Sequence, residues 1–143
     1  MKLNCWLITG GAFSMLAAFL HLGCIIGGPP WYRFFGAGES MAVLAARGSW
    51  KPALFAVSIA AVLGVWAAYA FSGAGLIPRL PLLKLGLVII CAVYLLRAAA
   101  FPVMMMVMGG RSTAFWLWSS AIVLIYGAVY TVGTWTAWRS LGG

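Results

Sequence analysis

Four long apolar stretches constrain this 143-residue chain more than any other feature of its sequence. They cover residues 5–27, 52–76, 83–108 and 113–138. Each is longer than the about 20 residues that a helix needs to cross the ~30 Å hydrocarbon core of a bilayer. Lipid offers no hydrogen-bond partner to backbone groups, so these stretches must be helical, and four segments are too few to close a barrel. The sequence therefore predicts an all-α membrane protein with four transmembrane helices.

The overall composition excludes a water-soluble fold, because 65% of the residues are hydrophobic and only 7% are charged. We expect one integral membrane domain over residues 1–143. Nine Lys and Arg residues stand against one acidic residue, which gives a formal net charge of +8. In a membrane protein this excess favours contact with anionic lipids. The basic residues are scattered singly, so we do not expect nucleic acid binding.

The connections between the stretches predict how the helices are arranged. Residues 77–82 and 109–112 are short links, which force consecutive helices to run antiparallel. We therefore expect an antiparallel four-helix bundle with both termini on one side of the membrane. The basic residues divide equally between the two sides, with Lys2, Arg79, Lys84 and Arg139 on the terminal side and Arg33, Arg47, Lys51 and Arg111 on the other. Cytoplasmic termini are favoured, because Lys2 and the α-amino group precede the first helix.

The long connection over residues 28–51 is predicted to lie at the membrane surface. Pro29 and Pro30 argue against a helix through its first half. That half is too aromatic for free solution, which places it at the level of the lipid headgroups. The second half predicts a short interfacial helix that is capped by Glu39 or Ser40 and stopped by Gly48.

Small residues at helical spacing predict the surfaces through which the helices pack, because close approach within a bilayer depends on them. These residues are Gly10, Ser14, Ala17, Ala18 and His21 in the first stretch, Ala56, Ala60, Gly64 and Ala68 in the second, and Ser120, Gly127, Thr131 and Thr134 in the fourth.

Arg97 is the most informative single residue, because it lies inside the third stretch, where a charge costs about 2.5–3.5 kcal/mol. Pro102 leaves the carbonyl of Ala98 without its helical donor, so this helix should be kinked. In a structural role, Arg97 would reach an interface or pin the bundle through free carbonyls. In a functional role, it would bind an anion.

Glu39 is the only carboxylate side chain, so an internal ion pair with Arg97 must use it. His21 and Arg97 lie ~9 Å and ~16 Å below the face that carries the long connection, at 1.5 Å per helical residue. Arg33 and Glu39 could then cover a pocket formed by His21, Tyr94 and Arg97. The alternative for Glu39 is a solvated helix cap.

Metal and cofactor binding are not predicted. His21 is the only histidine, and a core histidine bonded to a nearby hydroxyl or carbonyl explains it better than a heme or metal ligand. The methionines at residues 104–106 and 108 resemble a Cu(I) ligand set, but consecutive helical residues point in different directions, which favours apolar packing. Cys5, Cys24 and Cys91 form no C-x-x-C pair and are interpreted as packing residues.

The segments HLGCIIGGPPWYRFFGAGESMAVLAARGSW, LPLLKLGLVIICAVYLLR and GRSTAFWLWSS resemble a group of small, uncharacterised four-helix bacterial inner-membrane proteins. The resemblance covers most of the chain. It implies four spans in the bacterial inner (cytoplasmic) membrane, and it implies no activity.

No catalytic motif stands out, and catalysis would have to use His21 and Glu39 as acid and base. We therefore expect a non-enzymatic membrane bundle that binds a small amphipathic or anionic ligand, or a lipid headgroup, in a polar intramembrane pocket. The ligand-binding residues would be Arg97, Glu39, His21, Tyr94 and Arg33. One alternative is an accessory or immunity-type protein that acts on a membrane protein partner. A second is a small membrane isomerase or transporter.

Overall fold

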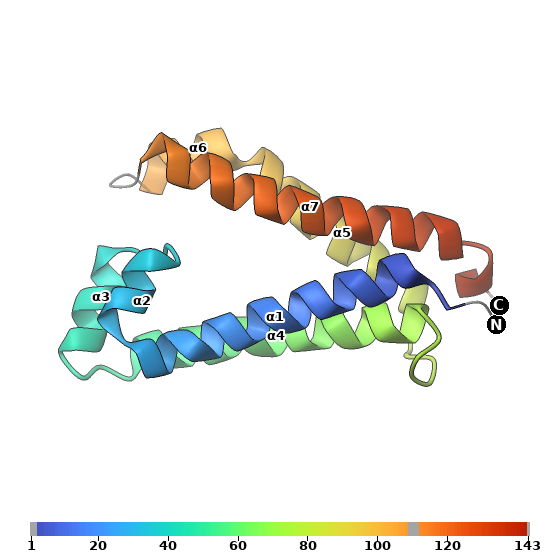
Figure 1. Ribbon diagram of the computed structural model, residues 1–143, viewed down its shortest axis with the longest axis horizontal. Coiled ribbons are helices and arrows are strands. Elements are labelled where there is room, and N and C mark those ends of the chain that lie inside the picture. Colours follow the sequence, from blue (N-terminus) through green and yellow to red (C-terminus); the bar gives the residue numbers. More distant parts are fainter. Residues whose placement is uncertain (1–2, 109–111, 143) are drawn as a thin grey trace. The chain divides into compact units, whose positions relative to one another are not determined.

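A computed structural model describes residues 3–108 and 112–142 of the chain, and its regular elements are all helical (Figure 1). The elements are α1 (Cys5–Gly27), α2 (Pro29–Phe34), α3 (Glu39–Ala46), α4 (Lys51–Gly73), α5 (Leu83–Ala99), α6 (Phe101–Met108), α7 (Thr113–Ala137) and the 3-10 helix η1 (Ser140–Gly142). No strand occurs within the described ranges. The all-α expectation is thus confirmed. Lys2, Arg111 and most of the 109–112 link, on which part of the orientation argument depended, lie outside the described residues.

Three helices, α1, α4 and α7, are long and apolar enough to cross a membrane. A fourth span results if α5 and α6, which meet at a bend of 58°, count as one broken helix. The protein is therefore a multi-pass membrane protein by the length and composition of its helices. The bend lies where the sequence predicted a kink, because Pro102 in the first turn of α6 cannot donate a backbone hydrogen bond to Ala98.

The surfaces of the long helices are suited to lipid rather than water. Only 28%, 28% and 22% of the residues in the apolar windows of α1, α4 and α7 are buried within the protein. The exposed remainder includes large apolar side chains, such as Phe19, Leu96 and Trp118. A soluble protein rarely exposes apolar surface on this scale, so these side chains require a surrounding apolar medium.

The chain divides into two compact units, which are described separately. The terminal unit comprises residues 1–13 and 66–143, and the loop unit comprises residues 14–65. Helices α1 and α4 each continue from one unit into the other.

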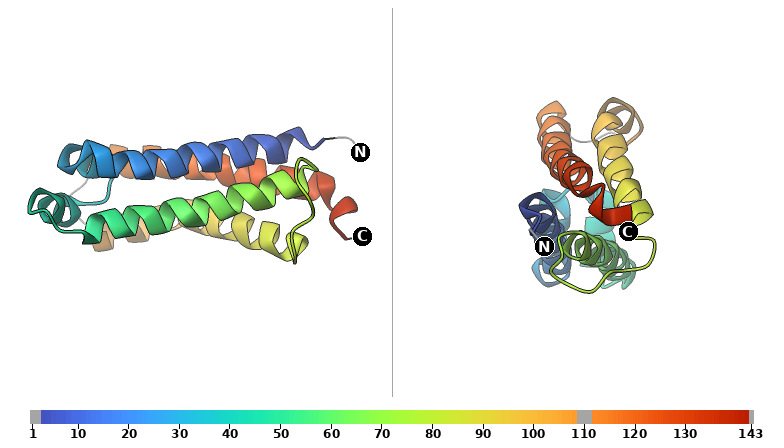
Figure 2. Two further views of the ribbon diagram at one scale, coloured as in Figure 1. Left: turned by 90° about the horizontal axis from the view of Figure 1, so that it is seen from below. Right: turned by 90° about the vertical axis from the view of Figure 1, so that its right-hand side faces the viewer.

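Within the terminal unit, α5 and α7 lie side by side, as Figure 2 also shows. Cys91 approaches Thr134, with 3.6 Å between sulfur and hydroxyl oxygen, whereas Arg97, further along α5, contacts Ser119, earlier on α7. The two helices therefore run antiparallel. The contact is close because Gly127 has no Cβ; a methyl group there would lie 2.9 Å from Leu95.

The first turns of α1 are fixed to the end of α7 in the same unit. The Asn4 side-chain amide donates to the carbonyl oxygen of Gly133 at 2.9 Å and to the hydroxyl of Thr136 at 3.0 Å. Leu7 is fully buried against Gly133, where a Cβ would come within 2.8 Å of it. These two hydrogen bonds connect residues that are separated by 129 and 132 positions in the sequence.

Within the loop unit, α2 and α3 pack on each other (Figure 1). The expectation that the two prolines exclude a helix was wrong, because α2 begins at Pro29 and Pro30. Proline is tolerated in a first turn, where the missing N–H has no helical acceptor in any case. The preceding Gly28 adopts a positive φ of 64°, which turns the chain from α1 into α2.

Helix α3 ends as predicted but starts differently. Its N-cap is Gly38, and no side chain caps it, so neither Glu39 nor Ser40 has the predicted capping role. Glu39 is instead the first residue of the helix, where its negative charge complements the helix dipole. Gly48, with a φ of 73°, follows the C-cap Arg47 and stops the helix.

The small residues that were predicted to form the packing surface of the second span, now α4, are not all buried. Ala56 and Ala60 are buried, but a Cβ on Gly64 would contact nothing within 4 Å, and Ala68 is only half-buried. The buried positions continue instead at Leu63, Ala67, Ala70 and Ala74. Steps of four and three alternate because a helix has 3.6 residues per turn, so a strict four-residue repeat drifts off the buried face.

Two further packing predictions need smaller corrections. In α1, Gly10, Ser14 and Ala18 are buried as expected, whereas Ala17 and His21 are half-buried. In α7, Ser120, Gly127 and Thr134 are buried, but Thr131 is exposed and bonds the carbonyl of Gly127 within its own helix. Tyr130 takes the buried position next to it.

Candidate functional site

Arg97 lies in the last turn of α5, immediately before the bend. The final carbonyl groups of a helix lack intrahelical donors and carry partial negative charge, which favours a cation at this position. This local stabilisation is part of the structural role that the sequence allowed for Arg97. It leaves the full positive charge of Arg97, on the apolar helix pair α5 and α6, without an acidic partner in the described part of the chain.

Among the described residues, the Arg97 side chain makes one hydrogen bond. Its Nη2 donates to the hydroxyl oxygen of Ser119 on α7 at 3.3 Å. Its Nη1 is buried and has no hydrogen-bond partner among the described residues. A neutral hydroxyl cannot balance the guanidinium charge, so the electrostatic requirement of Arg97 is unmet by this contact.

Two more polar atoms, on residues close to Ser119 in the sequence, are also buried without a hydrogen-bond partner in the described part of the chain. These atoms are Trp116 Nε1 and Ser120 Oγ. Both residues lie within one helical turn of Ser119 on α7. An indole N–H and a guanidinium N–H only donate, and a hydroxyl can donate as well. A group that satisfied any of these atoms would therefore need an acceptor oxygen.

A shallow apolar groove runs between α5 and α7 beside Ser120. Its volume is about 320 Å³, and Leu95, Ala98, Leu117 and Leu124 form part of its wall. The groove is large enough for a hydrocarbon chain and contributes little polarity of its own. The groove thus places apolar surface next to Ser120, whose buried hydroxyl has no hydrogen-bond partner among the described residues.

Tyr94, three residues before Arg97, belongs to an aromatic cluster in the terminal unit. Its ring centroid lies 4.9 Å from that of Trp66, 5.6 Å from that of Tyr126 and 5.4 Å from that of Tyr130. Such edge-on and tilted pairs stabilise a buried core. The cluster fixes the middle of α5 against α7, one turn before the candidate site.

Arg33 and Glu39 come together in the loop unit. Arg33 Nε donates to Glu39 Oε2 at 2.8 Å, and Arg33 Nη2 donates to Oε1 at 2.7 Å. This two-point pairing raises the pKa of Arg33, through the hydrogen bond first and the attraction between the charges second. The only acidic side chain of the protein therefore has a cationic partner six residues away.

His21 has a local partner in its own helix. Its Nδ1 lies 2.8 Å from the carbonyl oxygen of Ala17, one turn earlier in α1, so this nitrogen donates in the tautomer that the contact requires. No group of three or more His, Cys, Asp or Glu side chains suited to a metal ion occurs within the described ranges. Cys24 and Cys91 are buried, as expected of packing residues, whereas Cys5 is exposed.

The structure thus brings two of the five predicted site residues into direct contact, Arg33 and Glu39, and places Tyr94 and Arg97 on one helix. A pocket shared by all five remains a prediction. Sequence reasoning missed Ser119 as the hydrogen-bond partner of Arg97. The signal was available, because adjacent serines follow a tryptophan in the fourth apolar stretch, and serines are scarce in that stretch.

No protein family, no curated protein and no solved structure matches the chain, so the candidate site is interpreted from its own chemistry.

Proposed function

We propose that the protein is a non-enzymatic membrane bundle that binds an anionic or amphipathic small ligand, or a lipid headgroup, at Arg97. The single observation that carries this proposal is the buried Nη1 of Arg97, which has no partner among the described residues. A guanidinium within a span costs about 2.5–3.5 kcal/mol on insertion scales and more where it is unpaired. An anion supplied from outside the chain would remove that cost.

The charge inventory of the chain supports an external partner. Glu39 is the only acidic side chain, and it already makes a two-point ion pair with Arg33. A carboxylate that left Arg33 for Arg97 would break two charge-assisted hydrogen bonds. An external anion satisfies Arg97 without that loss.

The neighbouring donors support a ligand with several oxygens. Trp116 Nε1 and Ser120 Oγ are buried without partners, and Ser119 already contacts the guanidinium. A phosphate or carboxylate could accept from Arg97 at two points and from one of these donors as well. The apolar groove beside Ser120 suits the hydrocarbon part of an amphipathic ligand.

The proposal includes the arrangement expected from the sequence. In it, the four spans form an antiparallel bundle in a bacterial inner membrane with cytoplasmic termini. The connection over residues 28–51 lies at the membrane surface. The bound partner is a membrane lipid or an amphipathic molecule that arrives from the bilayer.

Gentle purification followed by native mass spectrometry tests this function. The wild-type protein should retain an anionic adduct that Arg97→Ala and Arg97→Gln lose. Glu39→Gln should keep the adduct, because Glu39 has Arg33 as its partner. Arg47→Gln, which removes an exposed charge outside the spans, is the matched control and should also keep it. An adduct that persists in both Arg97 variants, or a wild-type protein without one, would refute the proposal.

A further inference from the structure

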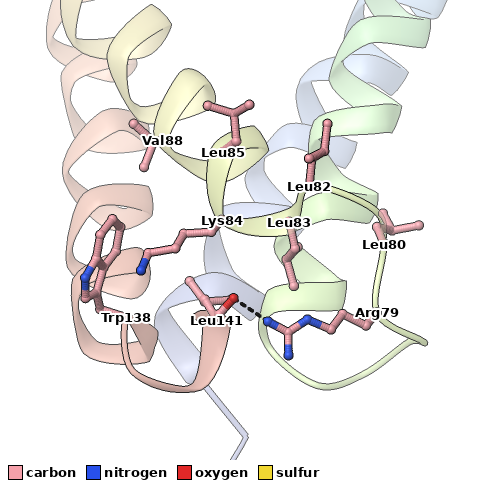
Figure 3. Close-up of a pocket in the computed structure, with 9 residues that line it drawn as sticks. All are labelled: Arg79, Leu80, Leu82, Leu83, Lys84, Leu85, Val88, Trp138 and Leu141. Atoms are coloured by element: carbon pink, nitrogen blue, oxygen red, sulfur yellow. Dashed lines mark hydrogen bonds between the residues drawn. The ribbon is translucent and has the colours of Figure 1, made fainter. Parts of the chain in front are cut away.

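A second, separate groove lies at the end of the terminal unit where α5 begins. It has a volume of about 490 Å³ and is bordered by the α4–α5 connection, the first turns of α5, the end of α7 and η1 (Figure 3). Two cationic side chains, Arg79 and Lys84, line it together with Trp138 and several leucines. None of the residues that line this groove is acidic.

Both cations are held in place by neighbouring groups. The ammonium nitrogen of Lys84 lies 3.8 Å from the centroid of the Trp138 ring, and Arg79 Nη2 donates to the carbonyl oxygen of Leu141. Figure 3 shows the Arg79 side chain extending to Leu141 in η1 and the Lys84 side chain extending to Trp138. These neighbours are a neutral ring and a neutral carbonyl, so they orient the two charges without neutralising them. The groove is therefore a prearranged site of positive charge.

The start of α5 adds to this positive potential. No side chain caps the helix, because its N-cap residue is Leu82. Uncapped N–H groups and the helix dipole favour an anion at such an end. The dipole and the two cations thus act in the same direction.

The apolar wall of the groove distinguishes a lipid from a free anion. Leu82 is 74% exposed, and Leu85 and Val88 continue the exposed apolar surface along the next turns of α5. Leu82 also adopts a left-handed φ of 53°, which is strained for a residue other than glycine. A strained, exposed leucine beside two cations has no role in binding a small hydrophilic anion, but it suits contact with an acyl chain.

We infer that this groove binds an anionic phospholipid, with the phosphate between Arg79 and Lys84 and an acyl chain along Leu82, Leu85 and Val88. Trp138 provides the amphipathic ring that such headgroup-level sites use. The inference does not depend on the proposed function at Arg97, because it involves other residues and a different part of α5. Its failure would leave that proposal unaffected.

Lipid retention in nanodiscs tests the inference. The protein is reconstituted in phosphatidylcholine with a fixed fraction of phosphatidylglycerol, and the bound phosphatidylglycerol is counted by native mass spectrometry. Arg79→Gln and Lys84→Gln should each lower its retention about fivefold, as expected for the loss of one basic residue near an anionic surface. Arg79→Lys and Lys84→Arg should keep most of it, which would separate loss of charge from loss of folding.

Arg139→Gln is the matched control, because Arg139 is an exposed cation at the same end of α7 that does not line the groove. An equal loss of lipid in Arg139→Gln would show diffuse attraction to the surface and overturn the site. Leu82→Gly tests the acyl contact, since it removes the backbone strain and should keep the protein stable while lowering lipid retention. If millimolar inorganic phosphate displaces the lipid completely and Leu82→Gly has no effect, the groove binds a free anion and the inference is wrong.

Discussion

Arg33 and Glu39 face each other across the turn between α2 and α3 and form two hydrogen bonds, at 2.8 Å and 2.7 Å. Their side chains are 48% and 65% exposed, so water and salt screen the pair. We predict a favourable but small coupling between Arg33→Gln and Glu39→Gln in a double-mutant cycle on thermal unfolding. The coupling should shrink as NaCl is raised from 50 mM to about 500 mM, because the Debye length then falls to a few ångströms and salt screens the two charges from each other.

The same cycle with Arg97→Gln distinguishes the two explanations for Arg97. Because Glu39 is paired with Arg33, the effects of Arg97→Gln and Glu39→Gln should add. A coupling between Arg97 and Glu39 stronger than that between Arg33 and Glu39 would mean that the carboxylate serves Arg97 and that no external anion is needed.

Tyr32 should make the stability of the loop unit sensitive to alkaline pH. It is buried with Cys24 and Ala42, and burial raises its pKa above 10.0, with a further contribution from charge on Cys24. A raised native pKa favours the protonated form, so the stabilisation is complete below about pH 10 and is lost as pH rises through the native value. We predict a fall in unfolding temperature above pH 10 that Tyr32→Phe reduces.

The contact between Gly27 and Trp31 leaves no room for a side chain. A Cβ on Gly27 would lie 2.1 Å from Cγ of Trp31, at the base of the ring, so the whole indole would have to move. We predict that Gly27→Ala destabilises the protein by about 1–3 kcal/mol, the usual cost of overpacking. Gly64→Ala is the control, because its Cβ would meet nothing within 4 Å. It should be neutral or stabilising by up to about 1 kcal/mol. If Gly27→Ala and Gly64→Ala lowered the unfolding temperature equally, the close contact between Gly27 and Trp31 would be contradicted.

Pro102 should be the cause of the 58° bend between α5 and α6. Pro102→Ala restores a donor for the carbonyl of Ala98 and should straighten the pair into one helix. Spin labels at Val88 and Met106, 18 positions apart, would then approach the about 27 Å of backbone separation of a continuous helix. In the wild-type protein their distance should be shorter.

Labels at Leu117 and Trp135 provide the control for this measurement. They have the same separation in sequence, and both lie on the exposed surface of α7, which is unbroken. Their distance should be the same in both proteins. An unchanged distance between the α5 and α6 labels in Pro102→Ala would assign the bend to packing instead of proline.

The sequence alone determined the features that depend on local composition. Apolar length predicted four spans, because the bilayer requires about 20 apolar residues with satisfied backbone bonds, and the structure has three helices of that length and the bent pair α5 and α6. Pro102 predicted the break, and Gly48 predicted the end of α3. Each of these depends on the backbone of a few neighbouring residues, which the sequence specifies directly. The same local reasoning failed at Pro29 and Pro30, where a position in the first turn reverses the usual effect of proline.

The tertiary structure decided which polar groups meet. The sequence offered Glu39 as a partner for Arg97, but the turn between α2 and α3 brings Glu39 to Arg33, and the antiparallel packing of α5 and α7 brings Ser119 to Arg97. The contact between Lys84 and Trp138 likewise joins the start of α5 to the end of α7. A hydrogen bond or ion pair forms only when two side chains approach within about 3–4 Å. That proximity depends on helix register and turn geometry, which single-residue patterns do not encode.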